Sequence, residues 1–81
     1  MTVRVKLFAV AKERVNREEV AIEMPDGATV GDLRRAVGTK FPTLASILPH
    51  ALWAVDAAYA NDSTILNEQS DVALIPPVSG G

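Results

Sequence analysis

The first third of the chain alternates between apolar and polar residues, which is the pattern of strands with one buried face. Apolar residues fall on every second position in residues 2–9, and they do so again in residues 18–24. Both segments are therefore predicted to be strands. Residues 10–17 between them are mostly polar, and we expect them to form a connection. Residues 25–27 (PDG) have the composition of a tight turn after the second strand.

A helix is predicted in the middle of the chain, where apolar residues recur at helical spacing. The apolar stripe consists of Val30, Leu33, Val37 and Phe41. Thr29 precedes the stripe and can accept a hydrogen bond from the free N–H groups of the first turn, with Asp32 in the reciprocal position of a capping box. Pro42 ends this helix at or before Phe41, because the residue before a proline disfavours helical geometry. Residues 43–48 could add one short helical turn.

The last third of the chain is predicted to be strand-like. Residues 52–58 and 64–66 are short apolar segments separated by polar turns, and residues 72–75 (VALI) are apolar enough for a strand buried on both faces. Pro76-Pro77 then stops backbone pairing, because neither residue has an N–H group. Strands and helices do not alternate regularly, so we predict an α+β fold: a mixed four- to five-stranded sheet with one main helix packed on one face.

Composition narrows the chemistry that the chain can perform by itself. Its 81 residues include no cysteine and one histidine, with a net charge of −2. These counts argue against a disulfide scaffold, a thiolate nucleophile and a histidine or cysteine metal site. The charges form no basic stripe for nucleic acid, and no apolar run approaches the roughly 18 residues that cross a bilayer. Charged residues interrupt the first residues, so we expect no signal peptide, a cytoplasmic location and no membrane partner.

The C-terminus is the most informative segment for function. A predicted strand leads into two prolines, and the chain then ends at Val78, Ser79, Gly80 and Gly81. We therefore divide the chain into a folded domain, residues 1–77, and a flexible tail, residues 78–81. The tail can reach about 13 Å at about 3.3 Å per residue. Its glycines have no Cβ and suit a narrow passage, although a frayed chain end would have a similar composition.

The sequence resembles the small subunit of molybdopterin synthase, the MoaD family, along its whole length. The ending of residues 72–81 (VALIPPVSGG) carries the most specific part of this resemblance. Residues 5–9 (VKLFA) with Lys12-Glu13 are similar to the family's first strand and following turn, and residues 29–34 (TVGDLR) are similar to its helix start. The resemblance implies a β-grasp, ubiquitin-like fold, which agrees with the predicted order of elements.

This resemblance also implies a sulfur-carrier function in molybdenum cofactor biosynthesis. The carboxylate of Gly81 would be adenylated, converted to a thiocarboxylate, and used to donate sulfur to a pterin precursor. Gly80, Ser79 and Val78 would form the tail that enters the partner. The chain would be a non-catalytic carrier alone and a part of the synthase with its large subunit. No tightly bound cofactor and no metal is implied, and ATP would be used by the activating enzyme.

The implied partners are the large synthase subunit (MoaE-like), an adenylating enzyme (MoeB-like, related to E1 enzymes) and a sulfur donor protein, in a heterotetrameric synthase. Phe8 lies on the polar face of the first strand, and an exposed aromatic side chain there is a candidate interface residue. Tyr59, Ile75, Pro76 and Pro77 complete the predicted partner interface. Ile75 could equally belong to the core, and Tyr59 could be an ordinary surface residue.

Three other functions agree with a small domain that ends in Gly-Gly. One is a sulfur carrier for another pathway, such as thiamine synthesis or tRNA thiolation. Another is a ubiquitin-like modifier that is joined to lysines through Gly81. The last is a β-grasp interaction module whose tail has no reaction.

Overall fold

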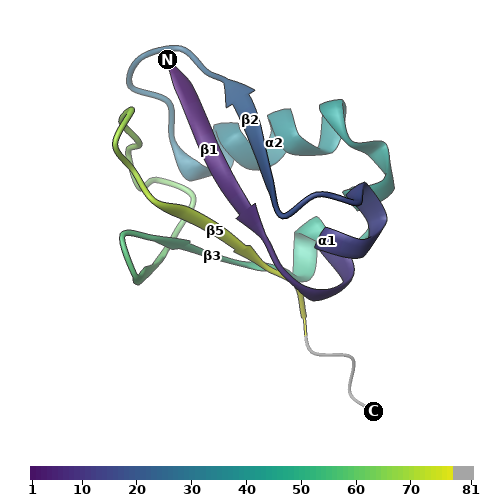
Figure 1. The fold of residues 1–81 in the computed structure, drawn as a ribbon. Coiled ribbons are helices and arrows are strands. Elements are labelled where there is room, and N and C mark those ends of the chain that lie inside the picture. Colours follow the sequence, from purple (N-terminus) through teal and green to yellow (C-terminus); the bar gives the residue numbers. More distant parts are fainter. Residues whose placement is uncertain (78–81) are drawn as a thin grey trace.

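The computed structural model describes residues 1–77, which form a sheet and helices that cover one side of it (Figure 1). The strands are β1 (Thr2–Leu7), β2 (Glu19–Glu23), β3 (Leu52–Val55), β4 (Ala58–Ala60) and β5 (Val72–Ile75). The helices are α1 (Ala9–Val15), α2 (Val30–Lys40) and two short 3-10 helices, η1 (Pro42–Leu44) and η2 (Leu48–His50). The predicted tail lies outside the described residues.

The five strands form one mixed sheet in the order β2-β1-β5-β3-β4. β5 is the last strand in the sequence but lies at the centre of the sheet, parallel to β1 and antiparallel to β3. The hairpins β1–β2 and β3–β4 flank it, and each is antiparallel. The predicted mixed sheet is therefore confirmed, and its central strand leads directly to the C-terminus.

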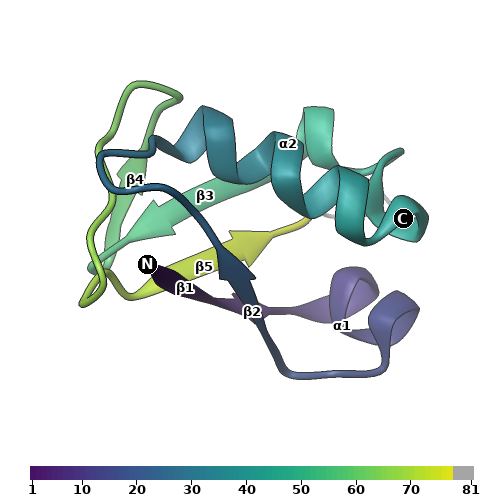
Figure 2. The same ribbon diagram turned by 90° about the horizontal axis from the view of Figure 1, so that it is seen from above.

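The main helix, α2, lies along one face of the sheet (Figure 2). Its predicted stripe faces the core, since Val30, Leu33 and Val37 are fully buried. Alternate strand residues complete this core: Val3, Val5 and Leu7 of β1, Val20 and Ile22 of β2, Trp53 of β3, and Val72 and Leu74 of β5. The period of two along each strand thus places one set of side chains under α2 and leaves the other set on an open face.

The predicted capping box at the start of α2 is confirmed. The backbone N–H of Asp32 donates to Thr29 Oγ1 at 3.3 Å, and the N–H of Thr29 donates to Asp32 Oδ2 at 3.0 Å. The second of these hydrogen bonds is the main reason why the pKa of the Asp32 carboxyl lies below its ordinary value. The N–H of Gly31 is satisfied from outside the helix, by the carbonyl oxygen of Asp62 at 3.0 Å.

Two predicted elements differ from the structure. The expected connection over residues 10–17 contains α1, which begins after Phe8 without a side-chain cap and with Ala9 at φ 50°. The helix still forms, because Ala11 is fully buried against the rest of the protein. The expected strand over 52–58 is two strands joined by a turn at Asp56-Ala57, whose positive φ angles of 52° and 67° suit a type I′ hairpin turn.

Two further predictions are corrected by the sheet. The expected strand over residues 64–66 is reduced to a single bridge between Ile65 and Thr29. β5 is buried on one face only, with Val72 and Leu74 in the core, whereas the side chain of Ile75 is half-buried. The physical reason is that α2 covers only one side of the sheet. Within residues 1–77, no helix has the length and apolar character that a bilayer crossing requires.

Candidate functional site

The candidate site is the region where β5 ends and the chain continues toward its C-terminus. β1 and β5 run parallel, so Phe8 follows β1 at the same edge of the sheet where Ile75 ends β5. Pro76 is buried and Pro77 is exposed. The structure therefore holds the first proline within the fold and presents the second at the surface. The residues predicted to react and to enter the partner, namely Gly81, Gly80, Ser79 and Val78, lie outside the described residues.

A hollow of about 490 Å³ lies where the tail begins, and we call it the tail-base hollow. Residues at the start of α1 and at the end of β5 line this hollow: Phe8, Ala9, Val10, Glu13, Ile75, Pro76 and Pro77. The structure thus brings together four of the predicted interface residues, Phe8, Ile75, Pro76 and Pro77. The Phe8 side chain is 48% exposed, which leaves much of its ring available for contact with another molecule.

An apolar patch extends from this hollow across the open face of the sheet. We call it the open-face patch, and it consists of Leu52, Ala54, Tyr59, Ala73 and Ile75. The strand register sets these side chains next to one another, because Leu52 pairs with Ile75 and Ala54 pairs with both Ala73 and Tyr59. Leu52 is 54% exposed and Tyr59 75% exposed. Large apolar side chains gathered on an exposed sheet face are typical of an interaction surface.

Leu52 is the interface candidate that the sequence analysis missed. Its position alternates with the buried Trp53, which predicts that the two side chains lie on opposite faces. That signal was available in the sequence. What the sequence lacked was the pairing of β3 with β5, which places Leu52 directly beside Ile75.

Ion pairs occupy the other half of the open face. Lys6 Nζ lies 3.3 Å from Asp71 Oδ1, and Arg4 Nη1 lies 3.3 Å from Glu19 Oε1. These pairs are exposed to solvent, so each contributes little to stability. They border the open-face patch with charges of both signs, which gives the patch a polar rim.

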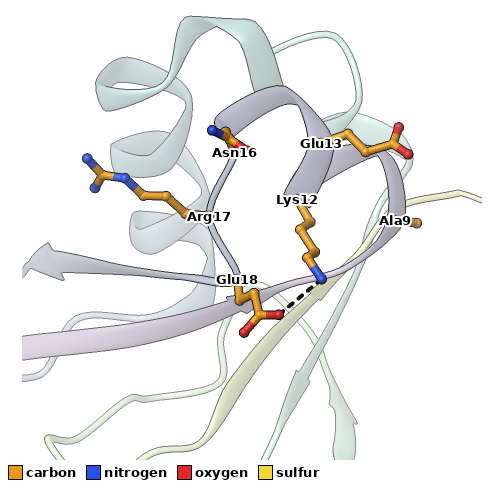
Figure 3. A pocket seen from close by; sticks show the side chains of 6 residues that line it. All are labelled: Ala9, Lys12, Glu13, Asn16, Arg17 and Glu18. Carbon is orange, nitrogen blue, oxygen red and sulfur yellow. Dashed lines mark hydrogen bonds and ion pairs between the residues drawn. The ribbon is translucent and has the colours of Figure 1, made fainter.

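A second, polar hollow lies beside α1 and is shown in Figure 3. Lys12 Nζ turns toward Glu18 Oε1 and lies 3.1 Å from it, whereas Glu13 points away from this pair (Figure 3). Among residues 1–77, no group of three or more histidine, cysteine, aspartate or glutamate residues is arranged to hold a metal ion.

Comparison with known proteins decides the family. The sequence profile of the ThiS family matches residues 5–81. The chain belongs to the ThiS family. Two proteins with similar sequences are both molybdopterin synthase sulfur carrier subunits. That of Caenorhabditis briggsae is 36% identical over 83 residues, covering 100% of this chain and 99% of the relative. That of Arabidopsis thaliana is 33% identical over 79 residues, covering 98% and 82%.

Solved structures with a similar fold include proteins of related function. SAMP1 from Haloferax volcanii matches with a TM-score of 0.87 and 27% identity, covering 100% of both chains. A chain of the complex of subunits 1 and 2 of the molybdopterin-converting factor from Helicobacter pylori matches with a TM-score of 0.70 and 26% identity, again covering 100% of both. The β-grasp, ubiquitin-like fold and the resemblance to the small subunit of molybdopterin synthase, both predicted from the sequence, are thereby confirmed.

Proposed function

We propose that this ThiS-family protein is the sulfur carrier subunit of a molybdopterin synthase. The observation that carries this proposal is the match to sulfur carrier subunits along the entire chain, at 36% identity in the Caenorhabditis briggsae relative. That match includes the C-terminal Gly80-Gly81, and a carrier of this kind would bear its sulfur on the carboxyl group of Gly81.

The proposed reaction uses the terminal carboxylate of Gly81. A carboxylate has a pKa of about 3.5 and is a poor electrophile when ionised, so it must first be activated. In an adenylating enzyme, a carboxylate oxygen attacks the α-phosphorus of ATP, which forms the acyl-adenylate and releases pyrophosphate. Sulfur at the oxidation level of sulfide, delivered by a sulfur donor protein, then replaces AMP at the acyl carbon. The product is a thiocarboxylate.

The second half of the reaction takes place on the partner. The large subunit would bind the pterin precursor and accept the tail, and the thiocarboxylate sulfur would pass to the pterin. An oxygen from water would then restore the Gly81 carboxylate for another cycle. A partner of this kind is supported by the similar Helicobacter pylori chain, which is part of a complex of subunits 1 and 2 of the molybdopterin-converting factor.

The described residues have a binding role in this proposal. Phe8, Tyr59, Ile75 and Pro77, joined by Leu52, would contact the large subunit, because they lie on the exposed surface from which the tail continues. Pro76 would act from within the fold, since its burial fixes the direction in which the chain leaves β5. A synthase of two carriers and two large subunits would form the proposed heterotetramer.

A second candidate function is that of a ubiquitin-like protein modifier. It is favoured by the likeness to SAMP1, a small archaeal modifier protein, with its TM-score of 0.87 over the full chain. A modifier would use the same Gly81 acyl-adenylate, but a lysine amine would attack it and form an isopeptide bond. A sulfur carrier for thiamine synthesis or tRNA thiolation would share the thiocarboxylate and differ in its acceptor.

Mass spectrometry of the intact protein distinguishes these functions. The protein is incubated with ATP, the adenylating enzyme of the same organism and a sulfur source. A mass gain equal to the exchange of one oxygen for one sulfur at Gly81 supports a carrier, whereas isopeptide-linked adducts support a modifier. An unchanged mass contradicts both. Reconstitution with the large subunit and pterin precursor then separates a molybdopterin carrier, which forms molybdopterin, from carriers of other pathways, which do not.

A further inference from the structure

Glu13 is an acidic residue that lines the tail-base hollow. Within residues 1–77 it makes neither an ion pair nor a side-chain hydrogen bond. Its neighbours on α1 differ. Lys12 pairs with Glu18, and Arg14 donates hydrogen bonds to the carbonyl oxygen of Thr43 at 3.0 Å and to Ser46. Glu13 therefore presents a free negative charge beside the start of the tail.

The position of this charge is set by the helix. Glu13 follows Ala9 by four residues and Val10 by three, so the three side chains share one face of α1, and all three line the hollow. Arg14 extends from another side of the helix and its hydrogen bonds tie α1 to the segment around η1. Figure 3 shows Glu13 directed away from Lys12 and Glu18. The helix thus fixes the backbone of Glu13 at the wall of the hollow, and the exposed side chain is available to a ligand there.

The remaining walls of the hollow are apolar. Phe8 offers a ring that is 48% exposed, and Val10, Ile75 and Pro77 offer aliphatic surface. A ligand suited to this hollow has an apolar stem and a positive head that can meet both a carboxylate and an aromatic ring. Arginine fits this description better than lysine, because its planar guanidinium forms paired hydrogen bonds with a carboxylate and stacks on aromatic faces.

We propose that the tail-base hollow receives an arginine side chain of the large synthase subunit, with its guanidinium paired to Glu13 and stacked on Phe8. This inference rests on the proposed function, and it names the chemistry of the partner at one point of the interface. The hollow shares Ile75 with the open-face patch, so the arginine would mark the edge of that interface nearest to the tail. It would thereby set the direction in which the tail enters the partner.

The test measures the affinity of the intact protein for the large subunit of the same organism by isothermal titration calorimetry. Glu13→Gln keeps the shape of the side chain and removes its charge, and we expect it to raise Kd about tenfold. Glu68→Gln is the matched control, because Glu68 is an exposed acid in the loop that precedes β5, at the other end of that strand from the tail. It should leave Kd unchanged. The fluorescence of Trp53, the single tryptophan, checks that each variant is folded.

Salt and chemical modification identify the partner group. The Kd of the wild-type protein should rise more steeply with sodium chloride than that of Glu13→Gln, because only the wild type forms the ion pair. Treating the large subunit with phenylglyoxal, which modifies arginine, should abolish the difference between wild type and Glu13→Gln. A difference that persists after this treatment would overturn the assignment to arginine.

The outcomes also separate this inference from the proposed function. Equal affinity of wild type and Glu13→Gln for the large subunit would overturn the arginine contact and leave the sulfur-carrier function standing. A wild-type protein that does not bind the large subunit at all would overturn both.

Discussion

Leu52 and Ile75 are directly paired across β3 and β5, and both side chains face the open side of the sheet. They come from strands that are far apart in the sequence, yet they form the end of the open-face patch that adjoins the tail-base hollow. Burying such side chains against a partner removes apolar surface from water, which is the main favourable contribution to most interfaces.

Leu52→Ser is expected to weaken binding to the large subunit about tenfold, because it removes a large exposed apolar side chain from the patch. The stability of the free protein should change little. Ile65→Ser is the matched control: Ile65 is also a large exposed apolar residue, at 68%, but it lies in the loop bridged to Thr29 and outside the patch. Equal losses of affinity in both variants, measured by calorimetry, would show that the patch is not the interface.

Gly81→Ala is expected to abolish sulfur transfer, and so is any extension beyond Gly81. An added methyl group would clash in a narrow passage of the partner that accepts only glycine. An extension removes the terminal carboxylate that would be activated. The measurement is formation of molybdopterin by the reconstituted synthase. Unfolding curves followed by Trp53 fluorescence should match those of the wild type. Full activity of an extended protein that had not been trimmed would contradict the proposed mechanism.

Gly38→Ala is expected to stabilise the protein by about 0.5–1 kcal/mol, because alanine has the higher helix propensity. The added Cβ would lie 3.2 Å from Leu48 Cδ1, at the end of a side chain that can move aside. Gly31→Ala in the same helix should instead lower the free energy of unfolding. There the Cβ would lie 3.2 Å from the backbone carbonyl oxygen of Asp62, which is held by its hydrogen bond to the Gly31 N–H. Denaturant unfolding of the two variants measures both effects.

Asp62 is expected to make the protein more sensitive to acid. Arg34 donates hydrogen bonds to its two carboxylate oxygens at 2.5 and 2.7 Å, and these lower the pKa of Asp62 below its ordinary value of 3.8. A carboxyl with a lower pKa in the folded state contributes stability above the unfolded pKa and loses it as pH falls through the folded pKa.

Asp62→Asn should therefore lower stability at neutral pH and flatten the decline of stability below about pH 4. Thermal unfolding from neutral to acid pH measures this dependence. Glu68→Gln, at an exposed loop residue that makes no ion pair or side-chain hydrogen bond within residues 1–77, is the control and should keep the decline of the wild type. An unchanged acid limb in Asp62→Asn would show that the Arg34–Asp62 pair does not contribute to acid sensitivity.

Ala57→Gly is expected to raise stability by about 1 kcal/mol. Ala57 sits in the β3–β4 turn at φ 67°, a left-handed conformation that costs a residue with a Cβ about 1–2 kcal/mol. Glycine adopts this conformation freely, and Asp-Gly is a preferred pair in type I′ turns. Ala58→Gly is the control, because it places glycine inside β4 and should destabilise. Denaturant midpoints that shift in the same direction for both variants would contradict this interpretation.

Several structural features were not predicted from the sequence for one physical reason: the local sequence signal was weak where tertiary contacts decided the structure. α1 has no side-chain cap, so its start could not be recognised from residues 8–10, and the burial of Ala11 supplies the stabilisation instead. The β3–β4 turn has no glycine at Ala57, so residues 52–58 resembled one strand. The burial of Pro76 depends on its surroundings in the fold and has no signature in the order of residues.

The sequence alone determined the features that depend on near neighbours along the chain. Alternation predicted the strands now seen as β1 and β2, and Thr29 with Asp32 predicted the start of α2, because periodicity and capping act within a few residues. The full-length resemblance indicated the family, whereas the reaction at Gly81 stays a prediction.

Only the tertiary structure decided which strands became neighbours, because strand pairing joins residues that are distant in the sequence. That pairing put β5 at the centre of the sheet, set Leu52 beside Ile75, and brought Phe8 and Glu13 to the hollow where the tail begins.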